Sequence, residues 1–270
     1  MKTWKYLISA ISVFTLLPLC LNAQDLEVPY VATPPDVVEE MLRIAGVGPG
    51  DYVIDLGSGD GRIVIEAAKK GALGHGVDLD EKLVEKSYKN AEKAGVADRV
   101  QFFTEDIFET DFSMASVITI YMSNDINRRM RPLLLKNLEP GTRIVSHIFH
   151  MGEWQPYKQS AVNRHNIYLW KVPADVEGTW RWQVNGKEYE LSMSQKFQEI
   201  TETRLIVNES VISSKKIEAS LKGGRITIMK TSNSHRYVFN GVVSGGEIKG
   251  SLQIHDGEQS RVESWQAQRN

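Results

Sequence analysis

The sequence predicts a doubly wound α/β domain followed by a small antiparallel all-β domain. Helical and strand patterns alternate regularly between about residues 28 and 173, which is typical of a mostly parallel sheet covered by helices. Between about residues 176 and 270, alternating strand segments are separated by glycine-containing turns. A chain of 270 residues is long enough for two modest domains, each with its own core.

The N-terminal segment, residues 1–23, differs from both domains and predicts a secretory signal peptide. Lys2 and Lys5 give it a positive start, residues 6–21 are almost wholly apolar, and the small residue Ala23 stands at the expected cleavage point. A proline interrupts the apolar stretch, which is also short for a spanning helix, so an uncleaved membrane anchor is the alternative. We therefore expect an exported protein of the periplasm or cell envelope, attached to the membrane only through this segment if it stays uncleaved.

The cysteine count and the charge balance exclude several classes of function. The only cysteine, Cys20, lies inside the predicted signal, so the mature chain would carry no disulfide, zinc-thiolate site or thiol nucleophile. Lipidation of Cys20 is a weaker alternative, because Leu19 before it is bulkier than lipoprotein processing usually accepts. The chain has 32 basic and 34 acidic residues, a formal net charge of -2, which gives no electrostatic footprint for nucleic acid.

The α/β region begins with a helix, a strand and a second helix. Thr33 and Pro34 predict an N-cap followed by proline at the first helical position, and Gly46 predicts the helix end. After a turn, the strand 52–56 runs directly into a glycine-rich segment, and residues 63–70 form the next helix. One apolar face of the first helix comprises Val37, Val38, Met41, Leu42 and Ala45.

The same alternation continues through the rest of this domain. A strand at residues 76–78 precedes a helix over 81–94, with Gly95 as its stop. A helical stretch over 125–138 contains Pro132, so we expect it to be kinked or split. The remaining predicted strands, which complete a sheet of seven, are 99–104, 117–121, 143–149, 158–162 and 166–172.

The segment that carries the chemistry is Asp55-Leu56-Gly57-Ser58-Gly59-Asp60-Gly61-Arg62. A strand that opens through glycines into a helix is a nucleotide-binding device, because the backbone can approach the ligand closely and the helix offers unpaired N–H groups. Its spacing is G-x-G-x-G, with Arg62 where dinucleotide binders carry their third glycine. Asp55 would face an ammonium, and Asp78 at the end of the next strand can accept both ribose hydroxyls. Asp78 therefore indicates nucleoside binding, but dinucleotide binders share this feature, so it does not identify the cofactor.

These residues resemble the class I, seven-strand methyltransferases, which have a Rossmann-like fold and use S-adenosyl-L-methionine. The resemblance also includes Asp106 and the turn Glu139-Pro140-Gly141. It covers roughly residues 28–173 and not the last hundred. One branch is especially similar: it contains the mitochondrial lysine methyltransferases of the ATP synthase c-subunit and of the adenine nucleotide translocase, with many bacterial relatives. The segments that carry this closer similarity are 28–34, 55–65, 143–147 and 151–154.

The resemblance implies a role for each matching residue around S-adenosyl-L-methionine. Asp55, Gly57 and Gly59 would contact its methionine part, and Asp78 would hold its ribose. Asp106 would sit beside the adenine amino group, with Ile107 or Phe108 against the ring. The complete set of implied cofactor-binding residues is Tyr30, Thr33, Asp55, Gly57, Ser58, Gly59, Gly61, Asp78, Asp106 and Ile107.

The acceptor side of the site is less sharply defined by the sequence. The resemblance gives Tyr121, after the fourth strand, the position from which related enzymes reach the acceptor nitrogen; packing against the next helix is the alternative. The Asp/Asn-Pro-Pro-Tyr motif of adenine and glutamine methyltransferases is missing, which counts against those substrates. His147 and His150 would point to opposite faces of a predicted strand, so we interpret them as structural or substrate-lining and predict no metal site.

Three hypotheses for the function follow. The first is methyl transfer to a nitrogen acceptor such as a protein lysine. The second is methyl transfer to a small molecule. The third is a non-catalytic S-adenosylmethionine-binding protein of the cell envelope, which the signal peptide favours because the cofactor is made in the cytoplasm.

The last domain, residues 176–270, is predicted to be a small antiparallel barrel or sandwich, after an α/β domain over 24–173. Asn185-Gly186 is a strong hairpin signal between two alternating strands. Tyr237 and Phe239 share one face of a later strand, and Trp265 lies in the last strand. No catalytic constellation is present, so we expect substrate docking or stabilisation of the neighbouring domain, with small-ligand binding as the alternative.

Overall fold

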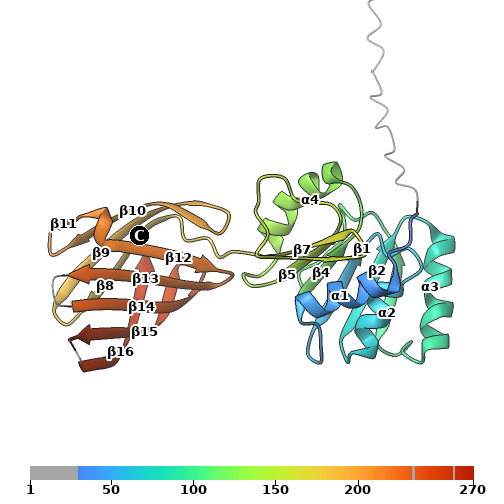
Figure 1. Cartoon of the computed structure of the whole chain (residues 1–270), viewed down its shortest axis with the longest axis horizontal. Helices are drawn as coiled ribbons and strands as arrows, with labels where there is room; N and C mark the ends of the chain where they lie inside the picture. The colour runs from blue at the N-terminus through green and yellow to red at the C-terminus, as the bar shows by residue number, and fades with distance from the viewer. Residues whose placement is uncertain (1–29, 233–234, 258) are drawn as a thin grey trace, which may run out of the picture.

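The computed structural model describes residues 30–232, 235–257 and 259–270, which form two β-sheet domains joined by a short linker (Figure 1). The predicted signal peptide and its cysteine lie outside the described residues. A seven-stranded sheet with helices is followed by a nine-stranded antiparallel sheet, as the sequence predicted in outline. No helix within the described ranges is long and apolar enough to cross a membrane.

The first domain is a mixed sheet with one reversal of strand order. Its elements are α1 (Pro35–Ala45), β1 (Tyr52–Leu56), α2 (Arg62–Lys69), β2 (Leu73–Asp78), α3 (Glu81–Ala94), β3 (Val100–Thr104), β4 (Val117–Ile120), α4 (Asn124–Asn137), β5 (Arg143–His147), β6 (Lys158–Val162) and β7 (His165–Lys171). The strand order is β3-β2-β1-β4-β5-β7-β6, and β7 runs antiparallel to both of its neighbours. The order reverses between β1 and β4, and such a switch point leaves a ligand-binding crevice at the carboxyl ends of the two strands.

Helix α1 begins one residue later than predicted. It starts at Pro35, and Pro34 is the flanking residue with a ψ of 148°. Because a residue before a proline is pushed out of the helical region, Pro35 delays the helix, and Thr33 is not its N-cap. The Thr33 hydroxyl instead forms a hydrogen bond of 3.2 Å with Nδ1 of His147. The predicted end is confirmed, since Gly46 takes a left-handed φ of 66°.

The structure corrects the region around α4 and β5. α4 is one helix through Pro132 and is not split there. Pro132 is exposed, so water can reach the carbonyl group that its missing N–H leaves unpaired. β5 ends at His147 instead of residue 149, because Ile148 takes a left-handed φ of 63°. His150 therefore lies in a loop, and the prediction that the two histidines point to opposite faces of a strand is wrong.

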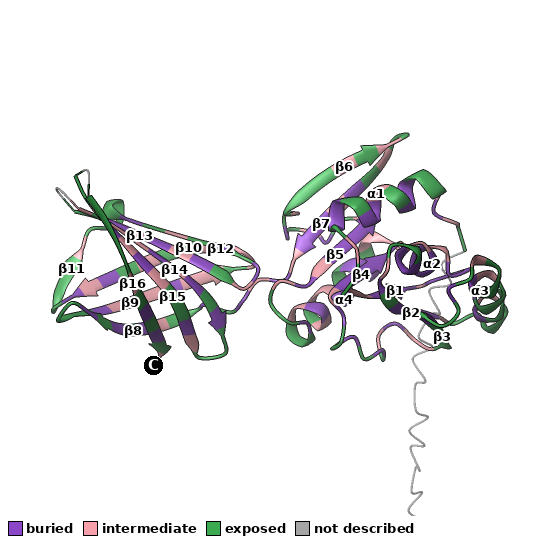
Figure 2. Cartoon of the chain, turned by 90° about the horizontal axis from the view of Figure 1, so that it is seen from below, coloured by how far each residue is buried: buried purple, intermediate pink, exposed green. Residues whose placement is uncertain are grey.

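Helices cover both faces of the first sheet. α1, α2 and α3 pack on one face, and the whole predicted apolar face of α1 is buried (Figure 2). α4 covers the other face together with the loop after β5. That loop buries Trp154, whose ring centroid lies 6.1 Å from that of Trp170 in β7. The carboxyl ends of β1 and β4 remain between the two layers as the place for a site.

The second domain is a nearly closed antiparallel barrel, which decides the predicted choice between barrel and sandwich. Its strands are β8 (Gly178–Val184), β9 (Lys187–Lys196), β10 (Glu199–Val207), β11 (Ser210–Ile212), β12 (Ile217–Lys222), β13 (Arg225–Ser232), β14 (His235–Ser244), β15 (Glu247–Asp256) and β16 (Gln259–Arg269), with a short helix η1 (Ser214–Lys216). Their order is β11-β10-β9-β8-β16-β15-β14-β13-β12. β10 also contacts β12, so the two edges of the sheet approach each other.

The barrel is built from hairpins around an aromatic core. The predicted hairpin turn is confirmed, because Asn185 and Gly186 both have positive φ values, 53° and 69°, as a two-residue type I′ turn requires. The ring of Phe239 in β14 packs edge-on against Trp265 in β16, with centroids 5.1 Å apart. Both side chains lie in the buried cluster that fills the barrel.

Two turns of the barrel contact the first domain. The β9–β10 turn stacks Phe197 on Trp154, with ring centroids 5.8 Å apart. In the same turn, the side-chain oxygen of Gln198 accepts a hydrogen bond of 2.7 Å from Nε1 of Trp154. The β12–β13 turn brings Gly223 so close to Gly141 that a Cβ on Gly223 would lie 3.0 Å from the Gly141 Cα atom. The two domains therefore share a packed joint in addition to the linker.

Candidate active site

The glycine-rich segment forms a loop between β1 and α2, at the crevice between β1 and β4. The backbone N–H groups of Gly57 and Ser58 both donate to the carbonyl oxygen of Val77 in β2, at 2.9 and 2.8 Å. Gly61 has a φ of 78° and directly precedes α2. The loop is thus tied to the neighbouring strand, and α2 begins where the loop ends.

Two glycines of this loop lie against side chains that leave no room for a Cβ atom. Gly59 has a φ of 55°, and a Cβ there would collide with the ring of Tyr30. Gly57 has a φ of 79°, and a Cβ there would lie 2.9 Å from Sδ of Met122. The loop, Tyr30 and Met122 therefore form a cradle that only a glycine backbone permits. The sequence identified Tyr30 but not Met122, which carries no motif of its own.

The Ser58 side chain packs against β2, on the side of the loop away from this cradle. Its side chain occupies the space above Gly76 in β2, where a Cβ would come within 2.5 Å of the Ser58 Oγ atom. The Ser58 hydroxyl is buried and has no hydrogen-bond partner among the described residues. Ser58 therefore supports the shape of the loop.

Asp78 fixes the far side of the loop. Its Oδ2 atom accepts a hydrogen bond of 2.8 Å from the N–H of Gly59, and its Oδ1 atom accepts one of 3.0 Å from the N–H of Asp80. Ser87 in α3 holds the same glycine from the other side, since its buried hydroxyl donates to the Gly59 carbonyl oxygen at 2.9 Å. The carboxylate that the sequence predicted at a ribose thus lies directly at the glycine loop.

Asp55 is a buried acid without a cation. It lies near the end of β1, only 2% exposed, and the Thr119 hydroxyl in β4 donates to its Oδ1 atom at 2.6 Å. Burial raises the pKa of Asp55 to about 7, against the opposing hydrogen bond from Thr119, and the negative charges of Asp78 and Asp60 add to the rise. No basic side chain among the described residues forms an ion pair with it. Such a carboxylate favours a positively charged ligand.

Arg62 has a role that no sequence motif indicated. Its guanidinium group pairs with Asp60 at 2.7 Å, and it donates to the backbone carbonyl oxygen of Thr33 at 2.8 Å. It therefore ties the segment before α1 to the glycine loop and neutralises Asp60. The only sequence signal at this position was a negative one, the absence of a third glycine.

Asp106 follows β3 at the same edge of the sheet. β2 and β3 are parallel neighbours with Asp78 opposite Thr104, so Asp106 comes two residues beyond the register position of Asp78. Its Oδ1 atom accepts the N–H of Phe108 at 2.9 Å, which forms a tight turn. Ile107 inside this turn is buried in the core on the α4 side of the sheet. The carboxylates at this edge suit hydroxyl, amino and cationic groups better than phosphates.

An aromatic cluster surrounds His147 and includes Tyr121, the residue predicted for the acceptor side. The ring of Tyr121 lies 4.0 Å from that of His147 and 5.8 Å from that of Phe149. His147 is fully buried, and its Nε2 atom lies 2.8 Å from Nδ1 of His165, while its other nitrogen contacts Thr33. Burial, with a smaller effect of His165, lowers the pKa of His147 to about 4, so this imidazole is neutral at pH 7.

His150 does not join this cluster. Its N–H donates to the side-chain oxygen of Asn124 at 3.0 Å, and its Nδ1 atom accepts the N–H of Gly152 at 2.9 Å. Its contacts are those of a loop residue near the start of α4. Within the described part of the chain, no three His, Cys, Asp or Glu side chains gather in a metal-binding arrangement.

The same site-bearing region is similar to known methyltransferases. The family model of the ANTKMT methyltransferase domain matches residues 55–158. A protein-lysine N-methyltransferase of Saccharolobus islandicus (strain REY15A) is 41% identical over 153 residues, which is 54% of this chain and 94% of that enzyme. The adenine nucleotide translocase lysine N-methyltransferase of Mus musculus is 30% identical over 173 residues, covering 61% of this chain and 74% of the mouse protein.

Two further matches extend this comparison. The ATP synthase c-subunit lysine N-methyltransferase of Mus musculus is 30% identical over 54% of this chain, and the chain spans 59% of that protein's length. Among solved structures, an RNA methyltransferase from Salinibacter ruber in complex with S-adenosyl-L-homocysteine is 47% identical with a TM-score of 0.53. That match covers 54% of this chain and 96% of the Salinibacter chain.

Proposed function

The chain belongs to the ANTKMT family of class I S-adenosylmethionine-dependent methyltransferases, and we propose that it methylates lysine side chains of a protein. The observation that carries the proposal is its match to an archaeal protein-lysine methyltransferase over nearly the whole of that enzyme. The Salinibacter relative bears the name of an RNA methyltransferase. A formal net charge of -2 on this chain does not favour a polyanionic substrate, so RNA enters the test below as a competing acceptor.

The residues at the loop fit S-adenosyl-L-methionine. When bound, the cofactor supplies a methyl group on a positively charged sulfur, already activated for displacement. Tyr30 and Met122 lie against the glycines of the loop, along which the cofactor would bind. Asp55 has no cationic partner among the described residues and offers its carboxylate to an ammonium group. Asp78 would hold the ribose hydroxyls, and Asp106 the adenine amino group.

Tyr121 and His147 are our candidates for the acceptor side. A lysine ammonium must lose its proton before its nitrogen can attack, and a dry pocket promotes that loss. Neutral His147 is buried between Thr33 and His165, and its ring packs against the ring of Tyr121. Tyr121 would then orient the acceptor nitrogen in line with the methyl group, which is the main contribution a protein makes to such a displacement.

The proposal is tested by following methyl transfer with the chain from Gln24 onward. The purified protein is incubated with labelled S-adenosylmethionine in three separate reactions. One contains a protein extract, one total RNA and one the small-molecule fraction, all prepared from cells that naturally produce the protein. We expect label in protein, at lysine by mass spectrometry. Label confined to RNA or to small molecules would overturn the lysine assignment, and cofactor binding without transfer to any fraction would favour a binding protein instead.

We expect Tyr121→Phe to lower the rate of lysine methylation about tenfold or more while the affinity for S-adenosylhomocysteine stays within about twofold. The substitution keeps the ring on His147 and removes only the hydroxyl group. Tyr157→Phe, an exposed tyrosine in the loop before β6, is the matched control and should leave both quantities unchanged. An unchanged rate for Tyr121→Phe removes its hydroxyl from the reaction.

We expect the affinity for S-adenosylhomocysteine to fall about tenfold between pH 8 and pH 6. The raised pKa of Asp55, about 7, means that the free protein protonates this carboxyl as the pH drops, and only the ionised form pairs with an ammonium. Calorimetric titration across this range measures the effect. Asp55→Asn should bind more weakly at pH 8 and show a flat profile. A wild-type affinity that is constant from pH 6 to 8 would rule out this role for Asp55.

A further inference from the structure

One lysine of the barrel points into its interior. Lys230 in β13 is only 7% exposed, and its ammonium lies 4.7 Å from the ring centroid of Tyr237 and 5.6 Å from that of Tyr189. Within the described ranges, no carboxylate lies at ion-pair distance from it. Burial, with the nearby charge of Lys187, holds the pKa of Lys230 below its usual value. Because an ammonium buried without a counter-ion is unfavourable, this position favours the arrival of an anion.

A second donor in the same interior also lacks an acceptor. The indole Nε1 of Trp182 in β8 is buried and has no hydrogen-bond partner in the described part of the chain. Its ring stacks on Tyr189, with centroids 5.2 Å apart and planes only 7° from parallel. Tyr189 is therefore bordered by an unpaired ammonium and by an unpaired indole N–H. Buried donors are normally satisfied, so this pair indicates a place where acceptors belong.

A hollow opens next to Tyr237, one of the two rings that contact the Lys230 ammonium. Its volume is about 210 Å³, and its lining includes His235, Tyr237, Ile254, Asp256 and Arg261. Tyr237 is the register partner of Lys230, so one wall of the hollow is the ring on which the ammonium rests. Tyr237 and Ile254 are the apolar part of its lining, and its other lining residues are polar or charged. Barrel mouths of this kind are common sites for small molecules.

The described acids at this mouth pair with side chains other than Lys230. Asp256 pairs with His235 at 3.1 Å, and Glu263 pairs with Arg261 at 3.1 Å. Among the described residues, neither of these acids forms an ion pair with the Lys230 ammonium.

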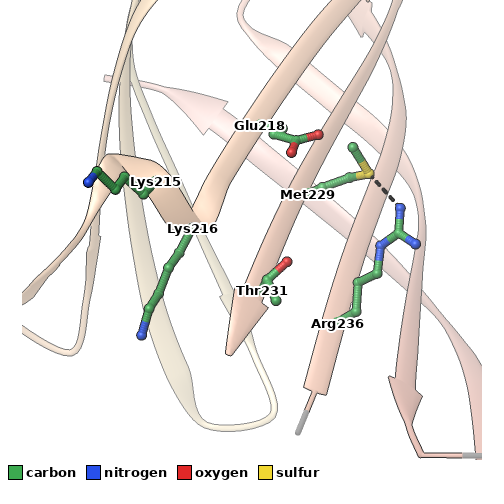
Figure 3. Close-up of a pocket in the computed structure, with 6 residues that line it drawn as sticks. All are labelled: Lys215, Lys216, Glu218, Met229, Thr231 and Arg236. Carbon is green, nitrogen blue, oxygen red and sulfur yellow. Dashed lines mark hydrogen bonds between the residues drawn. The ribbon is translucent and has the colours of Figure 1, made fainter. Parts of the chain in front are cut away.

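More cations gather outside the mouth. A second hollow, of about 260 Å³, lies on the outer face of β12, β13 and β14, and Lys215, Lys216 and Arg236 line it together with Glu218 (Figure 3). These side chains are exposed to solvent, so the outer hollow is not by itself a binding site. Its excess of positive charge can raise the local concentration of anions near the mouth.

The mouth faces away from the methyl-transfer site. The turns at Phe197 and Gly223 contact the first domain, whereas the hairpin turn at Asn185–Gly186 lies at the other end of the barrel (Figure 1). Lys230 comes at the end of β13 that is remote from Gly223. A ligand at this mouth is therefore separate from the methyl acceptor.

We propose that the mouth of the barrel binds a compact organic carboxylate, whose anionic group pairs with Lys230 and whose apolar part packs on Tyr237 and Ile254. The barrel is then a small-molecule-binding domain attached to a methyltransferase, independent of which acceptor the enzyme uses.

The test is calorimetric titration of the chain from Gln24 onward with two carboxylates, octanoate and benzoate, and with their neutral counterparts, octanol and benzyl alcohol. We expect at least one carboxylate to bind about tenfold or more tightly than its alcohol. Lys230→Met should remove that preference and leave alcohol binding unchanged. The control Lys216→Met, at the same end but outside the barrel, should keep the wild-type preference. Lys230→Arg retains the charge and should retain the preference in part.

Two outcomes would overturn the proposal. One is a wild-type protein that binds none of the four probes or binds acid and alcohol equally. The other is an undiminished carboxylate preference in Lys230→Met, which would place the anion elsewhere. If Lys230→Met does not fold, the reduced preference expected of Lys230→Arg, compared with the full preference of Lys216→Met, decides whether the anion lies at Lys230. A more stable Lys230→Met together with no wild-type binding would reduce Lys230 to a lysine whose stem packs on aromatic rings.

Discussion

Asp78→Ala is expected to weaken the binding of S-adenosylhomocysteine about 100-fold or more while the chain stays folded. The substitution removes the carboxylate proposed to accept two ribose hydroxyls, and hydrogen bonds to a charged group contribute about 1.5–3 kcal/mol each. It also removes the acceptor for the N–H of Gly59, so the glycine loop loses one of its ties. Two such bonds amount to about 3 kcal/mol or more, which is about two powers of ten in affinity.

Calorimetric titration measures this effect, with circular dichroism as the check on folding. Asp98→Ala is the matched control, because Asp98 is exposed in the turn before β3. The affinity of Asp78→Asn should lie between those of Asp78→Ala and the wild type, since the amide keeps an acceptor oxygen but loses the charge. An affinity of Asp78→Ala within threefold of wild type would mean that the nucleoside does not lie at this strand end.

The second large effect is expected at the joint between the domains. Trp154→Ala should lower the stability of the first domain by about 3–5 kcal/mol, the usual cost of removing a buried tryptophan side chain. Trp154 is 1% exposed and packs between Trp170 and Phe197. Its indole N–H is also the donor to Gln198 in the barrel. The barrel thus loses both a stacked ring and a hydrogen bond to its neighbour.

Differential scanning calorimetry distinguishes the lower stability of the first domain from the loss of its coupling to the barrel. In the wild type we expect the domains to unfold together, whereas Trp154→Ala should show the first domain unfolding at a lower temperature than the barrel. Phe197→Ala removes only the barrel side of the contact, so it should separate the transitions with a smaller loss of stability. A single transition in Trp154→Ala, shifted by less than about 2 °C, would show that the joint contributes little.

The parts of the fold that follow from short stretches of sequence were predicted correctly. The strand 52–56, the helix 81–94 and the hairpin turn at 185–186 have the predicted bounds or residues, because glycine stops, turn residues and apolar periods act within a few positions. The error at the end of β5 arose where a backbone dihedral changed without a sequence signal, whereas the late start of α1 follows from Pro35, which the sequence shows. Ile148 ends β5 in a left-handed conformation that an isoleucine gives no reason to expect.

Contacts between segments that are distant in the chain could not be predicted from the sequence. Thr33 and His147 are 114 positions apart, and only the sheet order brings the segment before α1 to the end of β5. Arg62 likewise became a tie to Thr33 through folding and not through any motif. The choice between barrel and sandwich had the same difficulty. Hairpin partners are local, whereas the approach of β10 to β12 is not.

The pairing of β16 with β8 affects how the protein folds during synthesis. The first sheet is complete in the chain at Lys171, so that domain can fold while the barrel is still being made. β8 is among the first barrel strands to leave the ribosome, yet its partner on one side is β16, whose paired residues are Gln268 and Arg269. Until those residues emerge, β8 has an open edge that can pair with a foreign strand. The nascent barrel therefore closes only after its last strand has been made, later than the sheet of the domain before it.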